Sequence, residues 1–281
     1  MRILCLHGLG TNSKILESQL TTLRSRLPSE WEFEFLDGEV EALPAPDEVL
    51  IVGVSEFFPG PYLCYYDDPT PQAVQDAVDM IMDVVQEDGP FDAILGFSNG
   101  AALAATVIAA GMEKDPSDPP FKAAIFICPT MPFRLDSGPL RVTVTDPDTI
   151  TAIRHDLDEE ASKTYDWLSD PETAGIMDEF EKKKKRLDYS DLSKLPQTVE
   201  LLLRYHPEVQ ARMLHIPTVH VIGDQDEYNE QGHKFTQLCD PKLRKVITHG
   251  GGHHSPKEKG AILKTCQAME WACDRIMFSS Y

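Results

Sequence analysis

The sequence contains no apolar run approaching the roughly 18 residues that a membrane-spanning helix needs. Positive charge is also scarce, because 26 lysine and arginine residues face 46 aspartate and glutamate residues, which leaves a formal net charge of −20. Such an acidic surface repels nucleic-acid phosphates and anionic lipids, so neither nucleic acid nor a membrane is an expected partner. The first residues show no secretory signal, and we therefore expect a cytoplasmic protein.

Cysteine motifs are missing too. The six cysteines are scattered along the 281 residues and form no C-x-x-C pair. We expect reduced, mostly buried thiols, and no resident metal, because zinc sites use closely spaced cysteine and histidine ligands. What remains is the composition of an ordinary globular protein, with 42% hydrophobic residues and enough length for one large core.

Short apolar runs alternate with amphipathic helical patterns along the chain. The run at 121–128 is almost continuously apolar, which is typical of a strand covered by helices on both faces. This order predicts an α/β protein with a mostly parallel sheet, right-handed helical crossovers and helices on both faces. The expected strands are 2–7, 31–36, 91–97, 121–128, 218–222 and 245–248, and the expected helices are 13–27, 71–86, 101–110 and 256–277.

One long segment interrupts this alternation. About 90 residues between Cys128 and Thr218 contain helical stretches but no convincing strand. An insertion of this size between two core strands is usually functional, for example as a lid, or partly disordered. We therefore expect a single domain over residues 1–281, with a helical lid insertion at 131–214.

A candidate nucleophile lies between the expected strand 91–97 and the small-residue helix that follows. Gly96-Phe97-Ser98-Asn99-Gly100 matches the pattern G-x-S-x-G in its usual strand–turn–helix context. A tight turn there lifts the Ser98 hydroxyl above the sheet at a helix N-terminus, and the glycines leave room for the turn. Ser98 is thus the expected nucleophile, and the alternative is that it only caps the helix.

The first expected strand ends in a glycine-rich turn, His7-Gly8-Leu9-Gly10. Such a turn aims a backbone N–H at a substrate carbonyl, and the natural donor pair for an oxyanion hole is Leu9 with Asn99. A nucleotide-binding loop is the alternative, but Ser13 stands where that motif needs its third glycine. His7 is expected to pack the loop.

Acids and histidines follow the last two expected strands, at the sheet edge where Ser98 also lies. The order Ser, Asp, His along the chain is the one used by α/β-hydrolases. An imidazole would take the Ser98 proton, and a carboxylate would fix the tautomer of that imidazole. We expect His253 as the base and Asp226 as the acid. The alternatives are Asp224, His254 and His249.

Several further motifs together characterise a known family. They are Leu6-His7-Gly8-Leu9-Gly10-Thr11-Asn12, Gln19 with Leu23-Arg24, Phe35-Leu36-Asp37-Gly38, Gly89-Pro90-Phe91-Asp92, Gly96-Phe97-Ser98-Asn99-Gly100-Ala101-Ala102, and Gly251-Gly252-His253 with Pro256. With them, most of the chain outside the expected lid resembles the fungal family of serine hydrolases that also includes the human ovarian-tumour-associated hydrolase. Two departures are Asn99, where the family commonly has Gln, and a longer insertion.

The resemblance implies an α/β-hydrolase fold and a triad of Ser98, Asp226 and His253 that needs no metal or organic cofactor. Members of the family include esterases, and thioesterases that release polyketide acyl groups from a carrier protein in fungal secondary metabolism. The implied substrate is an acyl ester or thioester, and an acyl carrier protein of a polyketide synthase is a candidate partner. A carboxylesterase on short or medium acyl esters, an acyltransferase and a catalytically silent binding protein remain alternatives.

Overall fold

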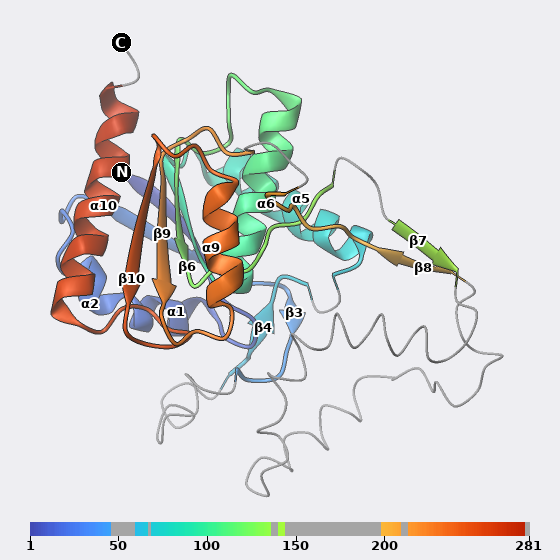
Figure 1. Ribbon diagram of the computed structural model, residues 1–281, viewed down its shortest axis with the longest axis horizontal. Coiled ribbons are helices and arrows are strands. Elements are labelled where there is room, and N and C mark those ends of the chain that lie inside the picture. Colours follow the sequence, from blue (N-terminus) through green and yellow to red (C-terminus); the bar gives the residue numbers. More distant parts are fainter. Residues whose placement is uncertain (46–59, 67–68, 136–139, 144–197, 209–212, 279–281) are drawn as a thin grey trace, which may run out of the picture.

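The computed structural model describes residues 1–45, 60–66, 69–135, 140–143, 198–208 and 213–278. At its centre lies a six-stranded sheet with the order β10-β9-β6-β5-β1-β2, in which every pairing is parallel (Figure 1). The predicted parallel sheet with helical crossovers is therefore confirmed. Its strands are β1 (Arg2–Leu6), β2 (Glu32–Leu36), β5 (Ala93–Phe97), β6 (Ala123–Ile127), β9 (Thr218–Gly223) and β10 (Arg244–His249).

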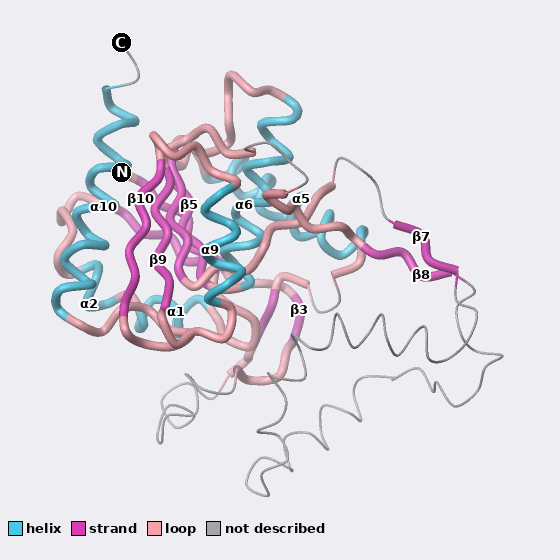
Figure 2. Tube along the Cα trace, viewed as in Figure 1, coloured by secondary structure: helices cyan, strands magenta, loops and turns pink. Residues whose placement is uncertain are grey.

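Helices cover both faces of the sheet (Figures 1 and 2). Side chains that alternate along a strand enter two separate clusters, as Ala93 and Leu95 pack on one face and Ile94 on the other. This two-sided burial explains the continuous apolar runs in the sequence. One face carries α1 (Ser13–Gln19), α2 (Thr21–Arg24) and α10 (Lys259–Phe278), and the other carries α5 (Pro71–Asp88), α6 (Asn99–Lys114) and α9 (Asn229–Gln237). Within the described ranges, none of the helices has the length and apolar character needed to cross a bilayer.

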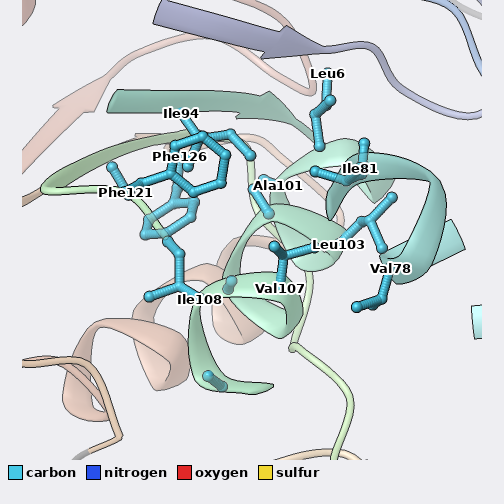
Figure 3. Packing of buried hydrophobic residues seen from close by; sticks show 14 of the residues in the cluster. Leu6, Val78, Ile81, Ile94, Ala101, Leu103, Val107, Ile108, Phe121 and Phe126 are labelled. Atoms are coloured by element: carbon cyan, nitrogen blue, oxygen red, sulfur yellow. The ribbon is translucent and has the colours of Figure 1, made fainter. Parts of the chain in front are cut away.

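Helix α6 is the central element of one cluster. The alanines of its first half, such as Ala101, are fully buried and let the helix approach the sheet closely. Its larger side chains, including Leu103 and Ile108, belong to the cluster that packs α6 against the sheet and α5 (Figure 3). The helix that begins beside the candidate nucleophile is thus anchored along its length.

The N-terminal helical pattern corresponds to two helices. The sequence predicts one helix over 13–27, whereas α1 ends at Gln19 and α2 begins at Thr21. Residues of both helices, Leu16 and Leu23 among them, are buried in the same cluster, so one apolar periodicity runs through the break. The start of α1 is fixed by Asn12, whose side chain accepts a hydrogen bond from the N–H of Ile15 at 2.9 Å.

Two short antiparallel strand pairs and the helix α9 were not predicted. β3 (Val40–Glu41) pairs with β4 (Leu63–Cys64), and β7 (Leu140–Thr143) pairs with β8 (Thr198–Leu201). The expectation of no strand between Cys128 and Thr218 is therefore wrong, because ladders of two to four residues are too short to show a periodic pattern and their partners are distant in the sequence. The greater part of the predicted helical lid, 144–197, lies outside the described residues, so the lid at 131–214 stays a prediction.

The packing of α6 leads to a test of stability. Leu103 is fully buried in the cluster, so Leu103→Ala should lower the free energy of unfolding by about 2–5 kcal/mol through lost burial and a residual cavity. Leu263 is 50% exposed, and Leu263→Ala should change it by less than about 0.5 kcal/mol. Urea denaturation of both variants makes the comparison, and equal losses would contradict the described packing.

Candidate active site

Ser98 occupies a sharp turn between β5 and α6. Its backbone angles are φ 53° and ψ −118°, a region that non-glycine residues rarely adopt and that often marks a functional site. The backbone N–H of Ser98 donates to the carbonyl of Ile127 at 2.9 Å, which ties the turn to β6. The Ser98 side chain makes no capping hydrogen bond to α6, so the capping alternative is not what the structure shows.

The glycines around Ser98 are required by close packing. A Cβ atom at Gly96 would lie 2.4 Å from the Cα of Ala101, and one at Gly100 would lie 2.4 Å from the carbonyl oxygen of His7. Real Cβ atoms essentially never make contacts under 3.0 Å. The first turn of α6 can therefore sit against the ends of β1 and β5 only with glycine at these positions, which is the physical basis of the G-x-S-x-G pattern here.

The three side chains predicted to converge do meet. Ser98 Oγ lies 2.7 Å from Nε2 of His253, and Nδ1 of His253 lies 3.0 Å from each carboxylate oxygen of Asp226. Because a carboxylate only accepts, Nδ1 carries the imidazole proton, and Nε2 accepts the hydrogen bond of the Ser98 hydroxyl. The residues follow β5, β9 and β10, so parallel strands bring them to one edge of the sheet.

The alternative acid and bases lie elsewhere. Nδ1 of His249 accepts from the N–H of Gly251, and Nδ1–H of His254 donates to the carbonyl of Ser255, so both contact nearby backbone. Asp224 is exposed, whereas Asp226, two residues further along the same loop, is buried. The structure therefore brings Asp226 and His253 to Ser98, and none of the three alternatives.

The Asp226 carboxylate is buried, since its side chain is only 1% exposed, and several donors surround it. Burial by itself would raise its pKa. The hydrogen bond and the electrostatic attraction of His253, the N–H of Tyr228 at 2.8 Å and the thiol of Cys128 outweigh burial, and together they lower the pKa of Asp226 below its ordinary 3.8. The carboxylate is therefore ionised near neutral pH and can hold the imidazole in its tautomer.

Three residues around the imidazole were not expected from the sequence. The rings of Phe97 and Tyr228 lie 5.2 Å and 5.1 Å from the His253 ring. Cys128 comes directly after β6, with φ 47° and a buried side chain. Burial, and then the charge of Asp226, raise the pKa of the Cys128 thiol well above its ordinary value, so it stays protonated. Its place at the end of a core strand was the signal that could have marked it.

The loop after β1 presents a backbone donor. The Gly8 carbonyl accepts from the hydroxyl of Thr11 and from Nδ1–H of His7, each at 2.8 Å. Since a trans peptide is planar, the N–H of Leu9 points away from that carbonyl. Nε2 of His7 accepts from the N–H of Gly38 at 3.0 Å, and burial lowers the pKa of His7, so this neutral imidazole holds the loop.

The loop that carries Leu9 lies beside Ser98, and Asn99 follows Ser98 in the chain. A Cβ atom at Gly8 would lie 3.4 Å from the Cβ of Ser98, which places the loop directly beside the hydroxyl. Asn99 opens α6, where backbone N–H groups have no acceptor within the helix. Its side-chain amide turns away and donates to the hydroxyl of Tyr66 at 2.8 Å, so replacing the family's Gln by Asn leaves the backbone donor in place.

Comparison with known proteins gives a consistent result. The family model described as "Serine hydrolase (FSH1)" matches residues 1–264 of this chain. "Hydrolase FUB4" of Fusarium oxysporum f. sp. lycopersici is 33% identical over 260 residues, which cover 92% of each chain. "Esterase FPY3" of Fusarium mangiferae is 30% identical over 262 residues, or 92% of this chain and 89% of that protein. "Esterase alnB" of Emericella nidulans is 29% identical over an alignment of 289 positions, which covers 96% of each chain.

The lowered pKa of Asp226 leads to a pH-dependent prediction. A carboxyl whose folded pKa lies below its unfolded value stabilises the fold above that unfolded value, and this contribution is lost as the pH falls through the folded pKa. The unfolding free energy of wild type minus that of Asp226→Asn should therefore decrease as the pH falls below 3.8, whatever its sign at neutral pH. Denaturation at several pH values measures it. Asp224→Asn, which removes an exposed carboxylate from the same loop, is the matched control for loss of one charge. A pH-independent difference for Asp226→Asn would refute the assignment.

Proposed function

Because the chain belongs to the serine hydrolase (FSH1) family, we propose that Ser98 is the nucleophile of an ester- or thioester-cleaving enzyme, with His253 as the base and Asp226 as the acid that orients it. The observation that carries this proposal is the continuous hydrogen-bonded relay from the Ser98 hydroxyl through His253 to Asp226, at 2.7 Å and 3.0 Å. A relay of this kind converts a weakly nucleophilic hydroxyl into one that attacks acyl carbonyls.

In the acylation step, the Ser98 oxygen attacks the acyl carbonyl carbon while its proton passes to Nε2 of His253. Asp226 stabilises the imidazolium that forms, without itself taking the proton. The N–H groups of Leu9 and Asn99 donate to the oxyanion, and the N-terminus of α6 adds a favourable dipole. His253 then returns the proton to the departing alcohol or thiol. In the second step, water attacks the acyl carbon and gives its proton to His253, the bond to Ser98 breaks, and His253 returns the proton to the Ser98 oxygen as the acid product leaves.

The preferred substrate in this proposal is a thioester of a polyketide or related acyl group, released from an acyl carrier protein in fungal secondary metabolism. The support is the family resemblance carried by the loop after β1 and the segment around Ser98. A carboxylesterase acting on short or medium acyl esters is the second candidate, and the names of two relatives, "Esterase alnB" and "Esterase FPY3", favour it. Both candidates use the same acyl-enzyme chemistry and differ in the leaving group.

The nucleophile and base have a direct test. Ser98→Ala and His253→Ala should each lower kcat on an activated aryl ester by at least about 10⁴-fold, because each removes an essential member of the relay. A fluorophosphonate probe should label wild type and fail to label Ser98→Ala. His254→Ala is the matched control, since the contacts described for this neighbouring ring are with the Ser255 carbonyl and the ring of His249 and not with the relay, and it should retain most of the wild-type rate. A folded wild type that resists labelling would instead favour a binding protein.

The leaving group is tested separately. Matched esters and thioesters of one acyl series, including β-keto acyl groups, should show kcat/KM higher for the thioesters by at least about tenfold, equivalent to about 1.4 kcal/mol of transition-state binding. Steady-state kinetics with purified wild type give the comparison. A preference for short acyl esters would support the carboxylesterase, and acyl transfer to an added alcohol or amine in preference to water would support an acyltransferase.

A further inference from the structure

A second arrangement of groups shares the triad's acid and base. Cys128 Sγ, a carboxylate oxygen of Asp226 and a ring nitrogen of His253 all lie within 4.8 Å of one another. Each residue follows a different core strand, so the sheet itself holds the three together. Among the residues that the structure describes, this is the one group of three or more potential ligands that is close enough to hold a metal ion. Thiolate, imidazole and carboxylate are the ligands that zinc takes in proteins.

The spacing is close to that of a real site. Zinc bonds of 2.0–2.3 Å in a tetrahedral arrangement place neighbouring ligand atoms roughly 3.3–3.6 Å apart. Nδ1 of His253 and the Asp226 carboxylate are already 3.0 Å apart, and the thiol, which lies within 4.8 Å of both, needs to approach them by at most roughly 1.2–1.5 Å. Cys128 is 1% exposed and the Asp226 side chain is equally buried, so a cation there would be shielded from competing water.

We propose that Cys128, Asp226 and His253 form an inhibitory site for a thiophilic divalent cation such as Zn²⁺. The inference rests on the proposed function in one respect, namely that His253 acts as the general base through Nε2. The cation would bind on the Nδ1 side of the imidazole, opposite the Ser98 hydroxyl, and would leave the substrate-facing side of the ring open.

Inhibition follows from the position of one proton. To bind a cation, Nδ1 of His253 must present its lone pair, so its proton moves to Nε2 and the ring stays neutral. The thiol of Cys128 loses its proton to solvent, and one proton is released for each cation bound. Nε2–H is then a donor and cannot accept the hydroxyl proton of Ser98, so the acylation step stops.

The surroundings that keep the free thiol protonated also favour a bound cation. Without a cation, burial and the negative charge of Asp226 keep Cys128 protonated. A divalent cation reverses both effects, because it stabilises the thiolate directly and is itself attracted by the carboxylate. Entry is possible from the solvent side of the loop, where the His253 side chain is 23% exposed and Gly250 borders open space.

The experiment compares inhibition by ZnCl₂, in a buffer that does not bind metals, for wild type, Cys128→Ser and Cys266→Ser. Cys266 is a matched control, since it is also a buried thiol but packs between α10 and α2. Relative to the uninhibited rate of each variant, the half-inhibiting concentration should rise at least about tenfold in Cys128→Ser, the low end of what losing even an indirect metal contact costs. It should stay near the wild-type value in Cys266→Ser, and a chelator should restore wild-type activity.

A second readout does not need activity. Titration with Cd²⁺ should produce the ultraviolet charge-transfer band of a thiolate–cadmium bond in wild type and Cys266→Ser, and no such band in Cys128→Ser. Cys128→Ala replaces the serine variant if a thermal melt shows that the latter does not fold. Equal zinc inhibition in all variants, or a cadmium band that does not depend on Cys128, would overturn the site. If wild type cleaves no ester but the Cys128-dependent band forms, the proposed function fails while the metal site stands.

Discussion

The parallel alignment of β5, β6, β9 and β10 is the constraint on which the site depends. In a parallel sheet all strands end at the same edge, so residues that follow different strands meet there although they are far apart in the sequence. Ser98, Cys128, Asp226 and His253 each come directly after a core strand or in the loop that follows it. Their mutual distances are therefore set by the spacing of the strands and by the short loops that carry them.

Much of this arrangement was predictable from residues, because it rests on strong local patterns. The apolar runs of the core strands predict burial on both faces of the sheet, and the glycines around Ser98 indicate a turn that has no room for Cβ atoms. The choice between Asp224 and Asp226 was less certain, since both carboxylates follow β9 within three residues. It is decided by a turn in which the N–H of Asp226 bonds back to the Gly223 carbonyl and directs the side chain inward, and no pattern in the sequence encodes that turn.

Other features depended on contacts that only the folded chain makes. The pairing of β7 with β8 joins short segments that are distant in the sequence, and neither segment is long enough to show a strand pattern. The contact of Cys128 with the acid required knowing that β6 and β9 are neighbours in the sheet. The Asp226 carboxylate thus accepts from several donors at once. The proposed catalysis needs a proton on Nδ1 of His253, whereas the proposed cation needs the lone pair of that nitrogen, so the two exclude each other.

The bond between Ser98 and His253 joins residues 155 positions apart, and it spans strands that are not neighbours in the sheet. A contact of such long range closes late in folding, because the intervening chain must first be ordered. During synthesis, the ribosome releases β1 to β6 before His253 has been added to the chain. In the proposed mechanism, hydrolytic activity therefore begins only when the last core strand and the loop after it have been added, because Ser98 has no base before then.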